Sequence, residues 1–369
     1  MRLLTVNTGS SSVRLALYAR DAEALRLLTS HHYSGEPHPE YALREFLGSE
    51  PVDAVAHRVV HGGEKLSAPC VIDADVEAEI ERLAALAPLH NPRALVWVRA
   101  CRSLLGKGLI QVAVFDTGFY AALPEVARSY ALPQQLAQHL GLRRYGFHGI
   151  AHQAMWRRWR HLRPEVASPG MTKGGRVISL QLGAGCSITA VADGAPQDTS
   201  MGFSPLEGLV MATRSGDIDP GLLLYLLRTE KMSIAELDHL LNHESGLRGM
   251  AGDDDMRKLL ASNEPAAQLA IELYCHRARK YVGAYLAVLG GADAILFGGG
   301  VGEHAPEIRE RILAGMEWVG IVLDRERNHA AAGTEACISR DDSPVAVWVI
   351  AVDEAQLLVE EAADLLLNR

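Results

Sequence analysis

Two short glycine-containing turns are the first candidates for chemistry in this chain. One turn, Gly183 to Ser187, joins the apolar runs 177–182 and 188–192, and the other, residues 7–12, follows the apolar run 3–6. Glycine lets backbone N–H groups approach a phosphate without a Cβ in the way. Either turn alone could belong to an ordinary β-hairpin, but the pair favours phosphate binding.

Two arginines indicate an anionic substrate. Arg58 lies at the end of an apolar run, where a buried arginine needs an anionic partner, although it could also simply edge a sheet. Arg214 lies in a segment rich in Gly, Ser and Asp, and it is followed by the carboxylates Asp217 and Asp219. Loops of this kind usually carry a site when a scaffold holds them. Planar arginine side chains suit carboxylate and phosphate alike.

Three further features fit such a site. Asp116 directly follows the apolar run 109–115, where a carboxylate commonly holds a metal or an active-site group but can also form a turn. His148 lies between two glycines, and its role, structural or functional, stays open. The glycine-rich run 298–303 follows a predicted strand and precedes a predicted helix, an arrangement that can hold a nucleotide.

The elements that position these groups repeat along the chain. Each half has a strand, a glycine-containing turn and a second strand, with Asn7 in the first half at the position of Gln181 in the second. This repeat predicts two similar domains. Residues 21–50 are polar and predict a loop plus a short helix. A long helix is predicted over residues 264–289, and its tyrosine stripe is either core or subunit interface; the stripe comprises Tyr274, Tyr281 and Tyr285.

Composition limits the possible partners. A chain of 369 residues favours two domains. A net charge of -9 argues against a nucleic-acid partner, so anionic substrates must meet local positive charge. The 5 cysteines are widely spaced and indicate neither a disulfide framework nor a zinc site. No apolar leader and no apolar run of membrane-span length is present, so we expect no membrane partner and a cytoplasmic location.

Taken together, the motifs resemble those of the acetate kinase family over nearly the whole chain. The long segment TSMGFSPLEGLVMATRSGDIDP is highly specific, and the other motifs follow the order of the family: NTGSSS, HRVVHGGE, APLHNP, FDTGFY, RRYGFHG, ESGLRGMAG and GGVGE. The resemblance implies an α/β fold of duplicated actin-like (ribonuclease H-like) domains that face a central cleft. It implies an N-terminal domain over 1–120 plus 356–369, and a C-terminal domain over 121–355 with the nucleotide site and the interface of a homodimer.

The resemblance also implies a reaction and its residues. The expected activity is reversible, ATP-dependent phosphorylation of acetate to acetyl phosphate by direct in-line transfer, with Mg²⁺ (or Mn²⁺) as cofactor. The catalytic residues implied are His148, Arg58, Arg214, Asp116 and Gln181, and the metal-associated pair is Asn7 and Glu354. The acetate pocket implied comprises Arg58, Val60, Leu89, Phe147 and Pro205. The nucleotide-binding residues implied are Arg14, Gly183, Ala184, Gly185, Asp255, Met256, Arg257, Gly300, Val301, Gly302, Glu303 and Ile308.

The chain departs from the family pattern at four positions. Arg14 replaces a lysine, Gln181 a histidine, Ala184 an asparagine and His304 an asparagine. Two alternatives therefore stay open beside acetate kinase. One is a kinase of propionate or another short-chain acyl group, and the other is a weakly active, nucleotide-binding regulatory relative.

Overall fold

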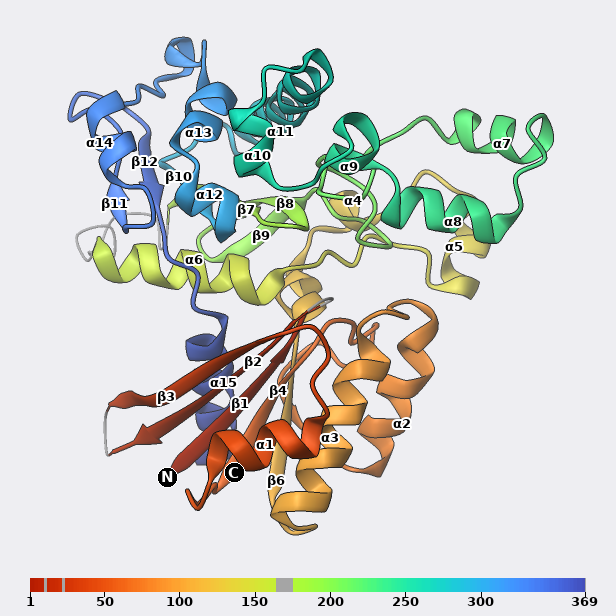
Figure 1. The fold of residues 1–369 in the computed structure, drawn as a ribbon, viewed down its shortest axis with the longest axis vertical. Helices are drawn as coiled ribbons and strands as arrows, with labels where there is room; N and C mark the ends of the chain where they lie inside the picture. Colours follow the sequence, from red (N-terminus) through yellow and green to blue (C-terminus); the bar gives the residue numbers. More distant parts are fainter. Residues whose placement is uncertain (10–11, 22–23, 164–174, 369) are drawn as a thin grey trace. The chain divides into compact units, whose positions relative to one another are not determined.

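The computed structural model describes residues 1–9, 12–21, 24–163 and 175–368, so Ser10 and Ser11 of the first turn lie outside the described residues. The chain divides into two compact units (Figure 1). Unit 1 comprises Met1–Ala121, Phe147–Ala154 and Asp353–Arg369, and unit 2 comprises Ala122–Gly146 and Met155–Val352. The domain boundaries predicted from the sequence differ from these units in that Phe147–Ala154 and residues 353–355 belong to unit 1.

Each unit contains one sheet and the helices that cover it. The elements of unit 1 are β1 (Arg2–Thr8), β2 (Ser12–Arg20), β3 (Leu25–Ser34), α1 (Pro39–Leu47), β4 (Ala54–Val59), β5 (Cys70–Val71), α2 (Ala74–Arg82), the 3-10 helix η1 (Leu83–Ala85), α3 (Asn91–Leu105), β6 (Ile110–Phe115), the 3-10 helix η2 (Asp116–Ala122), the start of α6 (Gly149–Leu162) and α15 (Glu354–Leu367).

Unit 2 holds the rest of α6 and most of the other helices. Its elements are α4 (Glu125–Arg128), α5 (Gln134–Leu140), β7 (Arg176–Leu182), β8 (Cys186–Ala192), β9 (Ala195–Thr199), α7 (Pro220–Arg228), α8 (Ile234–His243), α9 (Gly246–Ala251), α10 (Met256–Ala261), α11 (Pro265–Leu289), β10 (Ala294–Gly298), α12 (Gly299–His304), α13 (Pro306–Leu313), η4 (Glu317–Val319), α14 (Arg325–Ala330), β11 (Ala336–Cys337) and β12 (Ala346–Val349).

The two sheets have the same topology. Within the described residues each is six-stranded, and the orders are β3-β2-β1-β4-β6-β5 and β11-β12-β10-β7-β8-β9. In unit 1, β3, β2 and β1 run antiparallel, β1, β4 and β6 run parallel, and β5 is antiparallel to β6. In unit 2, β9, β8, β7, β10, β12 and β11 repeat these directions strand by strand. The predicted α/β class with a duplicated actin-like core is confirmed.

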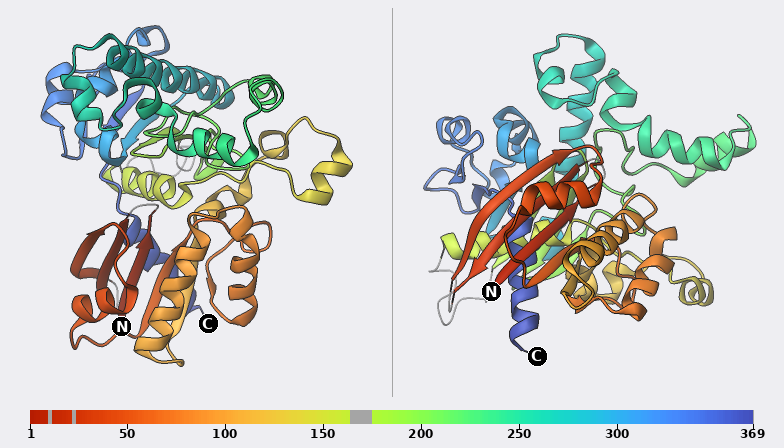
Figure 2. Two further views of the ribbon diagram at one scale, coloured as in Figure 1. Left: turned by 45° about the vertical axis from the view of Figure 1, so that its right-hand side comes forward. Right: turned by 60° about the horizontal axis from the view of Figure 1, so that its bottom comes forward.

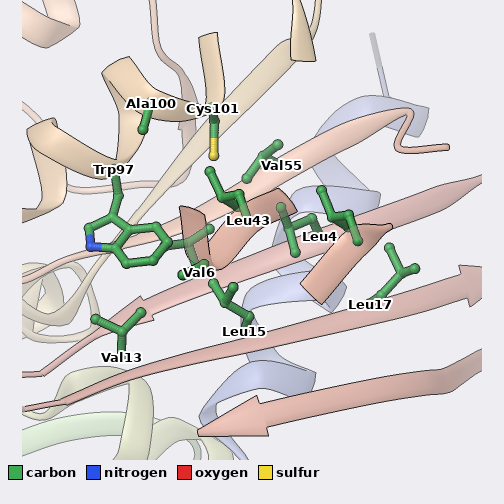
Figure 3. Close-up of a cluster of buried hydrophobic side chains, with 12 residues drawn as sticks. Leu4, Val6, Val13, Leu15, Leu17, Leu43, Val55, Trp97, Ala100 and Cys101 are labelled. Carbon is green, nitrogen blue, oxygen red and sulfur yellow. The ribbon is translucent and has the colours of Figure 1, made fainter. Parts of the chain in front are cut away.

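Alternation along the strands of unit 1 divides its apolar side chains between two helical layers. Leu4 of β1 faces α1 and α3, where it packs with Leu43 and Trp97 (Figure 3). Leu3, one residue earlier, faces the opposite way and packs against Val359 of α15. The views of Figures 1 and 2 agree that α1 and α3 cover one face of this sheet and α15 the other. Burial on both faces leaves the ends of the central strands as the place for polar groups.

In unit 2, α11 packs against β7 and β8 and supplies much of the core. Tyr274 and Tyr285 are 3% and 2% exposed, so the tyrosine stripe is core, and the alternative of a subunit interface is wrong for these two residues. Tyr281 directs its hydroxyl to Asp217. No helix of the described residues has the length and apolar character that a membrane span requires.

The prediction of a loop over residues 21–50 was wrong for β3. This strand pairs with β2 along its length, from Ser34 opposite Ser12 to Leu25 opposite Arg20. It lies at the edge of the sheet, and most of its side chains are exposed. Because only Leu25, Leu28 and Tyr33 pack against the core, its sequence lacks the alternation that marks a half-buried strand. The short helix predicted in the same segment is present as α1.

Candidate functional site

Three strand ends in unit 1 bring charged and amide side chains together. Asn7 is the penultimate residue of β1, Arg58 is the penultimate residue of β4, and Asp116 directly follows β6. Arg58 donates to Asp116 through two hydrogen bonds, Nε to Oδ1 at 3.0 Å and Nη2 to Oδ2 at 2.6 Å. This bidentate geometry is the strong form of an arginine–carboxylate pair. The arginine predicted to need an anionic partner therefore has one within its own unit.

Glu354 at the start of α15 completes this ion cluster, which comprises Asn7, Arg58, Asp116 and Glu354. Asn7 Nδ2 donates to Glu354 Oε2 at 2.6 Å, and Arg58 Nη1 lies 3.2 Å from Asn7 Oδ1 and 3.6 Å from Glu354 Oε2. Burial opposes the charge of Arg58, but Asp116 and Glu354 raise its pKa well above the ordinary value. Burial likewise opposes the charge of Glu354, yet Arg58 and the hydrogen bond from Asn7 lower its pKa. In this cluster one cation faces two carboxylates, and burial raises the pKa of Asp116.

His148 joins this cluster from a distant part of the chain. Its backbone N–H donates to the Asp116 carboxylate. Its φ of 57° is rare for a residue other than glycine, and strain of this kind is concentrated at functional sites. The next residue, Gly149, approaches the Asp116 carbonyl so closely that a Cβ would lie 1.9 Å from the oxygen. A glycine at this position therefore allows the start of α6 to bring His148 to Asp116.

The residues predicted for the acetate pocket are divided between the units. Val60 and Phe147 belong to unit 1 and are buried, and the Phe147 ring makes an edge contact with His61 at 5.7 Å. Leu89 also belongs to unit 1, but its side chain is 47% exposed. Pro205 belongs to unit 2, where its carbonyl lies 3.4 Å from Arg214 Nη1.

The second predicted phosphate turn lies between β7 and β8. Gly183 N–H donates to Gly185 O at 3.1 Å, and Ala184 O accepts from Ala212 N–H at 3.0 Å. Gln181, at the end of β7, lies beside Gly298 of β10, and its Oε1 is buried with no hydrogen-bond partner in the described part of the chain. Amide oxygen and nitrogen exchange places on a flip, so the side chain can present either an acceptor or a donor here.

A cavity of about 840 Å³ opens beside this turn, wholly within unit 2. Its size is that of a small-molecule site. Seven of the predicted nucleotide-binding residues line it, namely Gly183, Ala184, Asp255, Met256, Arg257, Gly300 and Val301, and so do Ala212, Asp254, Leu260, His304, Ala305 and Glu307.

The other predicted nucleotide-binding residues do not line this cavity. Ile308 is fully buried in the core of unit 2. Glu303 accepts hydrogen bonds from the backbone N–H groups of Gly299 and Val352, so its carboxylate stabilises the start of α12. Gly185 and Gly302 are not among the lining residues. Arg14 lies in unit 1, opposite Asn7 in the β1–β2 register, and its charge helps to lower the pKa of Glu354.

Asp255 shapes one wall of the cavity. Its Oδ1 accepts from the backbone N–H of Arg257 and so caps α10, while its Oδ2 accepts from Arg257 Nη2 at 2.6 Å. The side-chain hydrogen bond from Arg257, followed by the backbone bond, lowers the pKa of Asp255 to about 2. This carboxylate is ionised at any physiological pH.

Arg214 differs from Arg58 in having no carboxylate partner among the described residues. Its Nη1 makes only long contacts, 3.4 Å to Pro205 O and 3.9 Å to Met211 Sδ. Burial lowers the pKa of Arg214. Arg214 is half-buried, and a cation held partly out of water without a counter-ion is typical of a site that receives an anion. The carboxylates that follow it along the chain are engaged elsewhere: Asp217 binds Tyr281, and Asp219 caps α7.

Comparison with known proteins identifies the family. The family model described as the acetokinase family matches residues 44–360. A relative from Solibacter usitatus, named acetate kinase, is 40% identical over an alignment that covers 100% of this chain and 99% of the relative. This chain belongs to the acetokinase family.

Two solved structures support the assignment of fold and family. The crystal structure of Porphyromonas gingivalis acetate kinase matches with a TM-score of 0.87 and 36% identity, and the match covers 99% of each chain. That of a propionate kinase from Francisella tularensis matches with a TM-score of 0.86 and 35% identity over 98% of each.

Some residues of the candidate site in this acetokinase-family chain were not predicted from the sequence. Ala212, Asp254 and Glu307 line the cavity, and no motif marked them, although Asp254 and Glu307 directly precede the predicted residues Asp255 and Ile308. Tyr281 was assigned to an apolar stripe, although its hydroxyl reaches the loop that carries Arg214. A tyrosine within a buried stripe is itself a signal, because a buried hydroxyl needs a partner.

Proposed function

We propose that this protein transfers the γ-phosphoryl group of ATP to acetate and forms acetyl phosphate and ADP reversibly. The observation that carries the proposal is Arg214, a half-buried guanidinium without a carboxylate partner among the described residues of a chain of the acetokinase family. The reaction supplies anions for such a group, namely the carboxylate of acetate and the phosphoryl group in transfer. Arginine is the side chain best suited to both.

The ion cluster of unit 1 serves the acceptor end of the reaction. Arg58 remains fully charged beside Asp116 and Glu354, and it contributes positive charge at a fixed position. His148 is positioned by its backbone bond to Asp116 and stabilises charge that develops in transfer. Because the carboxylate of acetate is ionised at neutral pH, no strong general base is required. Catalysis of this kind depends on positioning and on charge neutralisation.

The cavity of unit 2 holds the nucleotide in this proposal. The turn of Gly183 and Ala184 exposes backbone at one side of the cavity, and Gly300 and Val301 of α12 line another. An 840 Å³ volume accommodates an adenosine with its phosphates directed to the turn. This supports ATP as the donor.

Magnesium fits the donor groups of unit 1. The oxygens that would hold it are Asn7 Oδ1 and the Glu354 carboxylate, which contact Arg58 Nη1 at 3.2 and 3.6 Å in this structure. Mg²⁺ in nucleotide sites typically takes one or two carboxylates, waters and substrate phosphates. No cluster of three or more His, Cys, Asp or Glu side chains among the described residues could hold a metal by itself. When bound, such a cation would neutralise phosphate charge. Mn²⁺ fits the same oxygen donors.

Propionate is the second candidate acceptor. One methylene changes discrimination by only about 1–3 kcal/mol. The match to the structure of a propionate kinase at 35% identity favours testing it.

We further propose a homodimer formed through unit 2. Tyr274 and Tyr285 of the tyrosine stripe are buried in the core and cannot supply the interface. Leu222 and Leu224 of α7 and Ile234 of α8 are 48%, 47% and 79% exposed, and a second copy of the chain would cover them.

All five cysteines are free thiols, which supports a reducing compartment such as the cytoplasm.

The test is a coupled assay of ADP formation together with hydroxamate trapping of the acyl phosphate. Purified protein with ATP and Mg²⁺ should form ADP and a trapped acyl group when acetate is added, and neither without it. Parallel reactions with propionate measure the preference between acceptors. If the protein binds ATP but forms no acyl phosphate with any short-chain acid, the proposed activity is wrong. The remaining alternative is then the weakly active, nucleotide-binding regulatory relative.

A further inference from the structure

The loop that carries Arg214 is closed at its base by Gly208 and Asp217. Gly208 N–H donates to Asp217 Oδ1 at 2.7 Å, and Asp217 N–H donates to Gly208 O at 3.0 Å. Gly208 has a φ of 106°, and a Cβ there would lie 2.7 Å from the Ser200 carbonyl oxygen. The two ends of this segment therefore meet at a fixed point, with Arg214 between them.

Two side chains of α11 hold this closure from outside the loop. Tyr281 Oη donates to Asp217 Oδ2 at 2.8 Å. Arg277 Nη1 lies 3.2 Å from Gly208 O, 3.1 Å from Asp217 O and 3.5 Å from Asp217 Oδ2, so it binds both ends of the loop. We call Asp217, Arg277 and Tyr281 the loop clasp. All its bonds lie within unit 2.

The direction of the Arg214 side chain depends on this loop closure, whereas the direction of Arg58 is fixed by an ion pair. An arginine in an ion pair is oriented by its carboxylate, as Asp116 orients Arg58. Arg214 has no such carboxylate among the described residues, and its own contacts are long. Its direction before substrate binds is therefore set by the backbone that carries it.

We propose that the loop clasp is a set of positioning residues for Arg214, with Tyr281 and Arg277 acting through Asp217. This inference rests on the proposed function, because it concerns how Arg214 receives the acyl acceptor. Burial, followed by the Asp217 carboxylate, raises the pKa of Tyr281 far above its usual range, so the hydroxyl stays protonated and donates. A hydrogen bond to a charged acceptor is among the stronger ones in a protein.

The test variant is Tyr281→Phe, which removes one hydroxyl and keeps the ring in the core. We expect kcat/KM for acetate to fall about 10-fold or more, with the KM for ATP changed less than about 2-fold, since a bond to a charged group is lost at the acceptor end only. Tyr225→Phe is the matched control, because it removes another tyrosine–carboxylate bond of unit 2, to Glu230. It should leave both constants unchanged.

A double-mutant cycle separates positioning from general stability. In the Arg214→Lys background, Tyr281→Phe should have less than a third of its effect on wild type, because both substitutions disturb one group. Full additivity, or a loss of thermal stability with unchanged kcat/KM, would overturn the proposal. If Tyr281→Phe does not fold, Asp217→Asn takes its place, because it keeps the side-chain shape and removes the charge. In that variant kcat/KM for acetate must fall while the KM for ATP stays nearly unchanged. A wild type inactive with all short-chain acids would instead refute the proposed function.

Discussion

The two sheets have the same topology, but the ends of their central strands differ in charge. The register of β1 with β4 ends at Val6 opposite His57, and the next two residues, Asn7 and Arg58, are 3.2 Å apart at their side chains. The register of β7 with β10 places Gly298 beside Gln181. The duplicated fold thus has an arginine in unit 1 where unit 2 has a glycine. A Cβ at Gly298 would lie 2.5 Å from both Met155 Sδ and Val352 Cγ2, so the position in unit 2 has no room for a side chain.

This difference shows how one topology supports two electrostatic tasks. Unit 1 holds Arg58 with two carboxylates, so the charge of this cation is compensated before any ligand binds. Unit 2 presents Arg214 without a carboxylate partner among the described residues, and its glycine-containing turns line a cavity. A compensated cluster keeps its geometry without substrate, whereas an uncompensated cation gains most when an anion arrives.

The largest effect should be shared by the two arginines. Arg58→Ala and Arg214→Ala should each lower kcat by about 10³-fold, since losing a charged clamp on a transferring phosphoryl group typically costs that much. Steady-state rates with saturating ATP and acetate measure it. Most of the wild-type rate in either variant would show that the arginine lies outside the reaction.

The free energy of unfolding should differ between Arg58→Ala and Arg214→Ala. Arg58→Ala leaves the 1%-exposed Asp116 without its partner, and breaking a buried pair costs about 3–5 kcal/mol. Arg214→Ala removes a half-buried cation that has no carboxylate partner among the described residues, and it should leave the free energy of unfolding unchanged or raise it. Denaturant titration of both measures the difference. Arg340→Ala is the control, because its pair with Asp342 is exposed and should contribute less than about 1 kcal/mol. Equal losses for Arg58 and Arg214 would contradict the comparison.

Acid should weaken unit 1 through buried histidines. Burial lowers the pKa values of His57 and His61 to about 4, and it lowers that of His152 as well. A neutral buried histidine stabilises the fold fully above its unfolded pKa of about 6.5, and this stability is lost as pH falls from there toward the folded pKa. Each such group should cost about 1.4 kcal/mol per pH unit over that window.

His57→Gln tests this prediction, because a glutamine amide can still donate toward Gln111 as His57 Nε2 does. Between pH 7 and 5 the variant should lose about 2 kcal/mol less stability than the wild type. The measurement is denaturant unfolding at each pH. His139, exposed in unit 2, gives the control variant His139→Gln, which should leave the pH dependence unchanged. Parallel losses in wild type and His57→Gln would exclude His57 as a source of acid sensitivity.

The sequence allowed some of this comparison to be predicted. The match of Asn7 to Gln181 and the need of Arg58 for an anion follow from local pattern and burial. The surroundings of Arg214 cannot be predicted in this way. Asp217 is only three residues from Arg214, yet its carboxylate accepts hydrogen bonds from Gly208 and Tyr281. Edge strand β3 was missed because pairing with β2 alone defines it. Long-range contacts between polar groups leave no period in a sequence.

The smallest effect concerns Gln181, the position that matches Asn7 in the duplicated sheet. Both carry amides, but Asn7 is bonded to Arg58 and Glu354, whereas Gln181 Oε1 has no partner among the described residues. The resemblance to the family implies a histidine here. A protonated histidine offers a charge-assisted hydrogen bond, which is roughly twice as strong as a neutral one.

Gln181→His should therefore raise kcat by about 10-fold, which corresponds to ~1.4 kcal/mol of transition-state stabilisation. Adding Ala184→Asn should raise it further, because Ala184 belongs to the turn that follows Gln181 and the two changes can couple. Gln197→His, on β9 of the same unit, is the control and should leave kcat unchanged. The measurement is kcat at saturating ATP and acetate. If both variants at Gln181 are slower than wild type, the turn is adapted to its amide, and the comparison with Asn7 becomes one between two amides with the same task.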